Sequence, residues 1–316
     1  MNRLIKYGSV EAIPFYNCSW KSNEEWWTTG VKRPWFGTPI VILGVIIEIL
    51  YIPVLYIIFK TNLIRYTCYK IMTMLAVMDI FQGAVFCSYP TFIYIAGGFV
   101  LSTWCCSCAI TVSLFLNRVW SIALKKYPEH YEKRIAYVSM ILCICYMVYL
   151  NMFTPGILFN SNIMIWLPDP LSEPEPSEEA TAWYSNTIHD LNNWLYVVLM
   201  FILFTIYYIL IKKAAQGQKS KSSKAIFFQC TIICFFNTAV AVIYNAVTLI
   251  TLAPWILVFC QLCWSINHGV PVIIYVTMND TVRRELKRLI CGGKAIRVRE
   301  KSVSVVSIQS IGIARF

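Results

Sequence analysis

Long apolar stretches alternate with short polar connections along most of the chain. A transmembrane helix needs about 20 mostly apolar residues, and charged side chains are rare within these stretches. We expect breaks near Gly97-Gly98 and Ala253-Pro254, because the apolar stretches around them are too long for one span. The pattern predicts seven spans, at about residues 38–59, 71–93, 100–123, 135–158, 192–211, 226–250 and 255–278.

Helices fit these stretches better than strands do. The stretches are continuously apolar and lack the alternation that is typical of a transmembrane barrel. The composition agrees, because 58% of the residues are hydrophobic and only 14% are charged, whereas soluble domains have about 45–50% and about 25%. We therefore predict an all-α membrane protein built as a seven-helix transmembrane bundle.

The basic residues collect on one side of this bundle. Lys and Arg favour cytoplasmic loops, and they are absent from the connections near 94–99, 159–191 and 251–254. The other three connections hold Lys60, Arg65, Lys70, Lys125, Lys126, Lys133, Arg134, Lys212, Lys213, Lys219, Lys221 and Lys224. The pattern predicts an N-terminus outside and a C-terminus inside. It also assigns the net charge of +11 to contact with anionic lipid rather than with nucleic acid.

Three parts follow from this topology: an extracellular segment at 1–37, the bundle at 38–279 and a cytoplasmic part at 280–316. On the outer side, Asn17-Cys18-Ser19 is an N-glycosylation sequon, so Asn17 is a candidate glycosylation site. The outer connection 159–191 is acidic and rich in proline. It is either a lip that attracts cationic ligands or a solvated loop.

A short amphipathic helix is predicted directly after the last span. Its apolar positions are Val282, Leu286, Leu289 and Ile290, and its basic positions are Arg283, Arg284, Lys287 and Arg288. Such a helix suits the surface of the inner leaflet. Cys291 at its end is either a palmitoylation site or a plain free thiol.

Three charged residues lie inside predicted spans: Glu48, Asp79 and Arg118. Charges there are costly and usually face the bundle interior, so we expect Asp79 to belong to an internal polar switch. Asn117-Arg118, at the inner end of the third span, either latches onto neighbouring helices or a cytoplasmic partner, or places its guanidinium at the interface. Glu48 has no evident partner in the sequence.

The last span combines His268, Pro271 and Tyr275. Proline loosens the backbone hydrogen bonds, and side chains or water can satisfy the freed groups. We expect a bent, partly hydrated helix that can move as part of the switch. His268 alone does not make a metal site.

Most of the 13 cysteines lie in apolar stretches, where cysteine behaves as a small hydrophobic residue. On the oxidising outer side, Cys18 is a candidate for a disulfide with Cys105 or Cys106. The chain has no Gly-rich phosphate loop, no His-Glu-x-x-His and no Gly-x-Ser-x-Gly motif. We therefore expect neither an enzyme nor a bound metal or cofactor.

Taken together, four motifs resemble those of the nematode serpentine chemoreceptors, most closely their class T (Srt) family. They are Tyr16-Asn17-Cys18-Ser19, Cys68-Tyr69-Lys70-Ile71-Met72 leading to Asp79, Asn117-Arg118, and His268-Gly269-x-Pro271-x-x-Ile274-Tyr275 with Asn279 and Arg283. The resemblance implies a rhodopsin-like architecture and a chemosensory G-protein-coupled receptor of the plasma membrane, with sensory cilia as an implied location. Unlike the wider rhodopsin-like pattern, the 159–191 connection contains no cysteine that could bridge to the third span.

We therefore expect a small-molecule ligand in an outward-facing cavity where the third, fifth, sixth and seventh spans converge. A heterotrimeric G protein would bind near Arg118 and the 212–224 connection. Two other classes stay open. A seven-span ligand-gated cation channel needs the opposite orientation, which the loop charges disfavour, and a small-solute transporter would be supported by repeats between two halves, which the sequence does not show.

Overall fold

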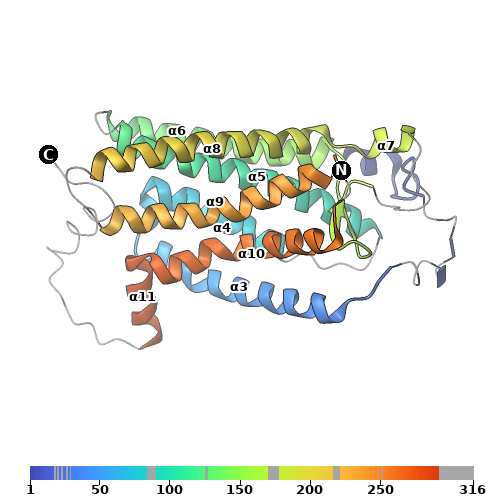
Figure 1. Cartoon of the computed structure of the whole chain (residues 1–316), viewed down its shortest axis with the longest axis horizontal. Coiled ribbons are helices and arrows are strands. Elements are labelled where there is room, and N and C mark those ends of the chain that lie inside the picture. The colour runs from blue at the N-terminus through green and yellow to red at the C-terminus, as the bar shows by residue number, and fades with distance from the viewer. Residues whose placement is uncertain are drawn as a thin grey trace.

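The computed structural model describes residues 1–291 except 18, 20, 23, 26, 27, 29, 84–89, 125–126, 170–177, 216–220, 248 and 251. Within these residues the long helices are α3 (Pro34–Lys60), α4 (Thr67–Gly83), α5 (Pro90–Ala123), α6 (Glu129–Phe153), α8 (Thr187–Ala215), α9 (Lys221–Val247) and α10 (Pro254–Met278). The short elements are α1 (Asn2–Tyr7), η1 (Leu63–Arg65), β1 (Leu158–Asn160), β2 (Ile165–Leu167), α7 (Glu178–Tyr184) and α11 (Asp280–Ile290). The long helices run side by side along the longest dimension of the molecule (Figure 1).

The bundle has two distinct ends. The β1–β2 hairpin and α7 lie at one end, which we call the hairpin end (Figure 1). The N-terminal ammonium of Met1 also lies there, because it donates to the carbonyl oxygen of Asn151 near the end of α6 (2.8 Å). At the opposite end, the α11 end, α11 crosses the direction of the long helices (Figure 1).

The helix surfaces are those of a membrane protein. Among the described residues, α3, α5, α6, α8 and α10 are each long and apolar enough to cross a bilayer. Large apolar side chains such as Leu142 and Phe201 are exposed on the outer helices α6 and α8, where lipid would solvate them. The predicted all-α architecture with membrane-spanning helices is confirmed.

Helix α5 is the central helix of the bundle. In its most apolar stretch 72% of the residues are buried, against 17% in α6. Cys106 and Ile110 pack in a core cluster with α3, α4 and α10, whereas Trp104 and Cys105 pack in a second cluster with α8 and α9. The two faces of α5 therefore join two halves of the core.

The boundary between the second and third spans differs from the prediction. Helix α4 ends at Gly83 and α5 begins at Pro90, so α5 continues through Gly97-Gly98 and the predicted break there is wrong. Proline suits the first turn of a helix, because its missing N–H has no partner to lose there. The glycines serve a close contact instead, since a Cβ atom on Gly97 would lie only 1.7 Å from the carbonyl oxygen of Ile157.

The outer connection after α6 begins with a hairpin rather than with more helix. Helix α6 ends at Phe153 and not at residue 158, because the residue before Pro155 is disfavoured in the helical region. Strands β1 and β2 then pair antiparallel, with Phe159 opposite Trp166. A Cβ atom on Gly156 would lie 2.8 Å from the backbone nitrogen of Gly98, so the hairpin sits directly on the backbone of α5.

The segment ahead of α3 folds onto the hairpin end. Val10, Ile13 and Tyr16 form a buried cluster with residues of α5 and α7. The Arg3 guanidinium lies 4.4 Å from the ring centroid of Trp183 and donates to its carbonyl oxygen (3.0 Å). Burial raises the pKa of the Tyr16 phenol above its usual range, so this hydroxyl stays neutral.

Candidate functional site

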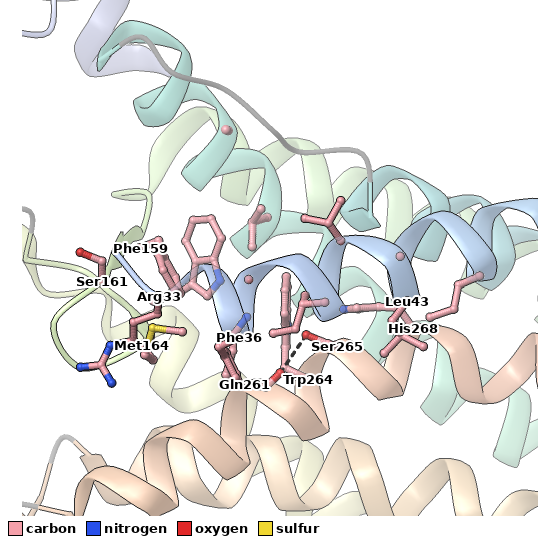
Figure 2. A pocket seen from close by; sticks show the side chains of 18 of the residues that line it. Arg33, Phe36, Leu43, Phe159, Ser161, Met164, Gln261, Trp264, Ser265 and His268 are labelled. Atoms are coloured by element: carbon pink, nitrogen blue, oxygen red, sulfur yellow. Dashed lines mark hydrogen bonds between the residues drawn. The ribbon is translucent and has the colours of Figure 1, made fainter. Parts of the chain in front are cut away.

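A cavity of about 570 Å³ extends from the hairpin into the bundle between α3 and α10. Ligand sites are typically about 300–1,000 Å³, largely apolar, with a few polar groups. Arg33 and Phe159 lie at one end of this cavity and His268 lies at the other (Figure 2). The walls come from α3, α5, α10 and the hairpin, with Asp79 of α4 at the inner end.

One face of α3 and one face of α10 make the longest walls. Gly37 and Gly44 lie two helical turns apart on α3, and a Cβ atom on either would meet no atom within 4 Å. These glycines therefore leave open space in the cavity. On α10, Gln261, Trp264 and His268 follow the spacing of one helical face and all line the cavity.

At the inner end of the cavity, Asp79 joins three helices. The Tyr51 hydroxyl of α3 donates to Asp79 Oδ2 (2.7 Å) and also lies 2.9 Å from the carbonyl oxygen of His268. His268 Nδ1 of α10 lies 3.1 Å from Asp79 Oδ1. All three side chains are buried, with Asp79 only 2% exposed. We call this group the Asp79 network. Both carboxylate oxygens have a partner, as a buried carboxylate requires.

The cavity walls contain buried polar atoms without a partner. Among the described residues, His268 Nε2, Gln261 Oε1 and Trp166 Nε1 have no hydrogen bond. Leaving such an atom unpaired costs about 1–3 kcal/mol. Each of these atoms is itself covered by neighbouring atoms, so a ligand can bond to one only after a side chain of the wall moves.

Glu48 lines the same cavity as His268. It is partly buried and interacts electrostatically with Asp79 and His268, although it makes no hydrogen bond in the described part of the chain. At the other end of the cavity, the Arg33 guanidinium donates to the carbonyl oxygen of Asn162 (3.0 Å). Glu48 thus belongs to the inner end of the cavity, a position that the sequence could not assign.

Asn117 and Arg118 lie in a second group, at the α11 end. Asn117 Nδ2 donates to Glu132 Oε1 of α6 (2.8 Å). Arg118 interacts electrostatically with Tyr69 of α4, whose hydroxyl accepts from Asn279 Nδ2 (3.0 Å). Because Tyr69 and Asp79 share α4, a rise of 1.5 Å per residue separates the two groups by about 15 Å. The predicted switch residues therefore form two groups rather than one.

Helix α10 passes both groups. Pro271 and Tyr275 are buried between His268 and the end of α10. Asn279 follows α10 and caps α11, where its Oδ1 accepts from the backbone N–H groups of Thr281 (3.1 Å) and Val282 (3.2 Å). The same Asn279 side chain thus fixes the start of α11 and bonds to α4.

The cavity matches the predicted position in part, because the third and seventh long helices, α5 and α10, line it as expected. The described residues that line it come from α3, α4, α5, α10 and the hairpin, and none comes from α8 or α9, the fifth and sixth long helices. The space between α5 and α8 is filled, because Trp104 Nε1 donates to Asn193 Oδ1 (3.0 Å) and Asn193 Nδ2 lies 3.2 Å from His189 Nε2. Apolar side chains of α5 and α8 pack in the same core cluster as Trp104.

The predicted disulfide of Cys18 with Cys105 or Cys106 lies partly outside the described residues. Cys105 and Cys106 are fully buried free thiols, whereas Cys18 lies outside the described residues. The prediction placed both cysteines near the outer end of a span that begins at residue 100. Because α5 begins at Pro90, they lie deep inside the helix packing instead.

The two candidate modification sites are accessible. Asn17 is exposed, and its Oδ1 accepts from the backbone N–H of Ser19 (2.9 Å). Cys291 is an exposed free thiol at the end of α11, beside the exposed Ile290. Within the described ranges, no three His, Cys, Asp or Glu side chains gather in a group that could hold a metal ion.

Several residues of the cavity and of the Asp79 network were missed at the level of sequence. Tyr51 follows Glu48 by one helical turn, and that spacing could have indicated it as a neighbour of a buried acid. Phe159 and Trp166 lie in the apolar start of the outer connection, which the hydropathy pattern did show. Gln261 and Trp264 gave no signal beyond their spacing to His268.

Two comparisons with known proteins cover nearly the whole chain. The family model described as "Serpentine type 7TM GPCR chemoreceptor Srt" matches residues 3–300. A Caenorhabditis elegans protein, serpentine receptor class T-55, is 22% identical over 323 residues, which cover 95% of this chain and 86% of that relative. The matched range includes the cavity, the Asp79 network and α11.

Proposed function

The chain belongs to the serpentine class T family of seven-transmembrane chemoreceptors, and on that premise we propose that it is a chemosensory G-protein-coupled receptor whose small-molecule ligand binds in the cavity between α3 and α10. The resemblance seen in the sequence is thereby confirmed. The family is one of multi-pass membrane receptors and not of enzymes.

The position of His268 carries this proposal. Its Nδ1 is bonded to Asp79, and the same side chain lines the cavity. A ligand packed against His268 therefore acts on the link between α10 and α4. A ligand shifts the equilibrium between an inactive and an active state only as far as it binds one of them better. The two states can differ in the contact between His268 and Asp79, which the ligand would then favour or disfavour.

Helix α10 offers a route from the ligand to the α11 end. Pro271 removes one backbone hydrogen bond just after His268. Below it, Asn279 bonds to Tyr69, which interacts with Arg118. A displacement of the end of α10 would change this contact and the start of α11 together. We assign the G-protein surface to Arg118 and the neighbouring basic connections.

We propose that the hairpin end faces outward and the α11 end faces the cytosol. The Lys and Arg residues of the connections, such as Lys60 and Lys212, lie at the ends of α3 and α8 that face α11. This orientation follows the preference of Lys and Arg for the cytoplasm. It places α11 and Cys291 at the inner leaflet, where palmitoylation would anchor them, and it suits a receptor of the plasma membrane or of sensory cilia.

The orientation predicts glycosylation at Asn17 and not at the second sequon, Asn279-Asp280-Thr281. When the chain is expressed in eukaryotic cells, N17Q is expected to remove one glycan, seen as a faster gel band that no longer shifts with glycosidase. N279Q should leave the band unchanged, since Asn279 would face the cytosol and its amide already bonds to Tyr69. A glycan on Asn279 would reverse the orientation.

Filling the cavity is expected to block the ligand response. An agonist would first be found by screening small molecules on cells with a second-messenger reporter. Gly44→Phe adds a ring where a Cβ meets no atom within 4 Å, so the helix can keep its place while the cavity is filled. We expect the concentration for half-maximal response to rise about tenfold or more, a loss of about 1.4 kcal/mol in binding, at unchanged surface expression.

The matched control is V45F, which adds a ring on the neighbouring residue. Val45 is 52% exposed and does not line the cavity, so V45F should respond as wild type does. A wild-type response of Gly44→Phe would remove the cavity from the proposal. Agonist-evoked currents that persist when G proteins are inhibited would favour a channel, and agonist uptake into vesicles would favour a transporter.

A further inference from the structure

The inner end of the cavity carries more acidic than basic groups. Glu48 and Asp79 both line it, and His268 is the basic side chain between them in electrostatic reach. The two acids therefore share one basic neighbour. Of the Lys and Arg residues in the described part of the chain, Arg33 lines the cavity. It lies at the opposite end, away from His268 (Figure 2).

Glu48 is a polar group of this region with no hydrogen bond of its own in the described structure, and its side chain lines the cavity. Both oxygens of a carboxylate accept hydrogen bonds. Asp79, by contrast, already has Tyr51 and His268 as partners. A ligand group that matches Glu48 must therefore donate hydrogen bonds.

Aromatic and aliphatic side chains make up the rest of the inner cavity. The ring of Trp264 lines it and packs edge-on against His268 with ring centroids 4.9 Å apart. Aromatic faces attract organic cations as well as apolar groups. Leu43 and Ile47 of α3 supply an apolar wall for the body of the ligand.

We infer that the cavity selects small organic cations, namely amines with an apolar body, whose ammonium group binds at the Glu48 and His268 end. An ammonium group has three donors and no acceptor, and its charge compensates the second carboxylate. A carboxylate ligand would instead meet two acids. The inference rests on the proposed function, because it names the ligand class of the same cavity.

The test uses the purified full-length protein in lipid nanodiscs and three probes with one skeleton: phenethylamine, phenethyl alcohol and phenylacetic acid. Thermal unfolding is measured at neutral pH, where the amine is protonated. A ligand that binds only the folded state raises Tm, so we expect phenethylamine to raise Tm, the alcohol to raise it less and the acid to leave it unchanged.

Glu48→Gln tests the acid directly. Glu48 makes no hydrogen bond among the described residues, so we expect E48Q to fold with the Tm of the unliganded wild type. The apparent affinity for phenethylamine should fall about tenfold or more, whereas the alcohol should bind as before. The control E285Q changes an acid on α11, outside the cavity, and should keep the wild-type Tm gain. E48D keeps the carboxylate and should retain part of the Tm gain from phenethylamine.

The outcomes separate this inference from the proposed function. If the alcohol or the acid stabilises as much as the amine, and Gly44→Phe removes that gain, the cavity binds ligands but the cation preference is overturned. If E48Q keeps the full gain from the amine, or if no probe stabilises the wild type, the inference is overturned as well. If all gains persist in Gly44→Phe, the probes bind elsewhere and the proposed cavity fails with the inference.

Discussion

Replacing Gly97 with alanine is expected to keep most of the protein from folding. The added Cβ would lie 1.7 Å from the carbonyl oxygen and 2.9 Å from the carbonyl carbon of Ile157. These are backbone atoms and cannot rotate away, so either α5 or the hairpin must move. Overpacking costs about 1–3 kcal/mol even where side chains can adjust. We expect at least about 3 kcal/mol here, a large part of a typical stability of about 5–15 kcal/mol.

The measurement is the fraction of monodisperse protein after mild detergent extraction, together with Tm in nanodiscs. Gly156→Ala should also lower Tm, because its Cβ would lie 2.8 Å from the backbone nitrogen of Gly98. Gly44→Ala is the matched control, since that Cβ meets nothing within 4 Å and alanine favours a helix by about 1 kcal/mol over glycine. Equal yields and Tm values for Gly97→Ala and Gly44→Ala would contradict the close contact.

The second large effect is expected for Asp79→Ala. This change removes the acceptor of His268 Nδ1 and the closer acceptor of the Tyr51 hydroxyl, both of them buried. Breaking a buried polar pair by removing one partner typically costs about 3–5 kcal/mol. We expect a loss near about 3 kcal/mol, because Tyr51 keeps the carbonyl oxygen of His268 as an acceptor. Asp79→Asn, which keeps the shape and one acceptor, should lose less.

A double-mutant cycle shows whether these residues act as a unit. Tyr51→Phe and Asp79→Ala remove the donor and the acceptor of one 2.7 Å hydrogen bond. The loss of unfolding free energy in the double mutant should therefore differ from the sum of the two single losses by about 0.5–3 kcal/mol. N117A lies in the group at the α11 end and should be additive with Asp79→Ala. If the losses for Tyr51→Phe and Asp79→Ala are additive, the two side chains are not coupled and the Asp79 network is contradicted.

The general architecture was predictable because lipid imposes simple rules. A span must be apolar for about 20 residues, so hydropathy alone indicates the long helices. A charge in a span must face the interior, so Asp79 and Glu48 stand out. His268 stands out as a polar residue three positions before a proline. The structure places these three side chains at one end of a cavity, although their role in a switch stays a prediction.

Other features depend on which helix faces meet, and one sequence does not encode that openly. Tyr51 has the same apolar character as its lipid-facing neighbours, so its spacing of one turn from Glu48 was the sole signal for its buried hydroxyl. Gly97-Gly98 looked like a chain break because glycine is common both in turns and at close helix contacts. The wrong start of α5 then shifted Cys105 toward the surface in the prediction.

The seating of the hairpin on Gly97-Gly98 has a mechanical consequence. Helix α5 has 34 residues, so it forms an unbroken strut of about 51 Å at a rise of 1.5 Å per residue. The hairpin contacts this helix at Gly97-Gly98, about two turns after its first residue, and Arg118 lies between one and two turns before its last. A tilt of α5 at the hairpin would therefore displace Arg118 as well, which makes α5 a second mechanical connection along the bundle besides α10.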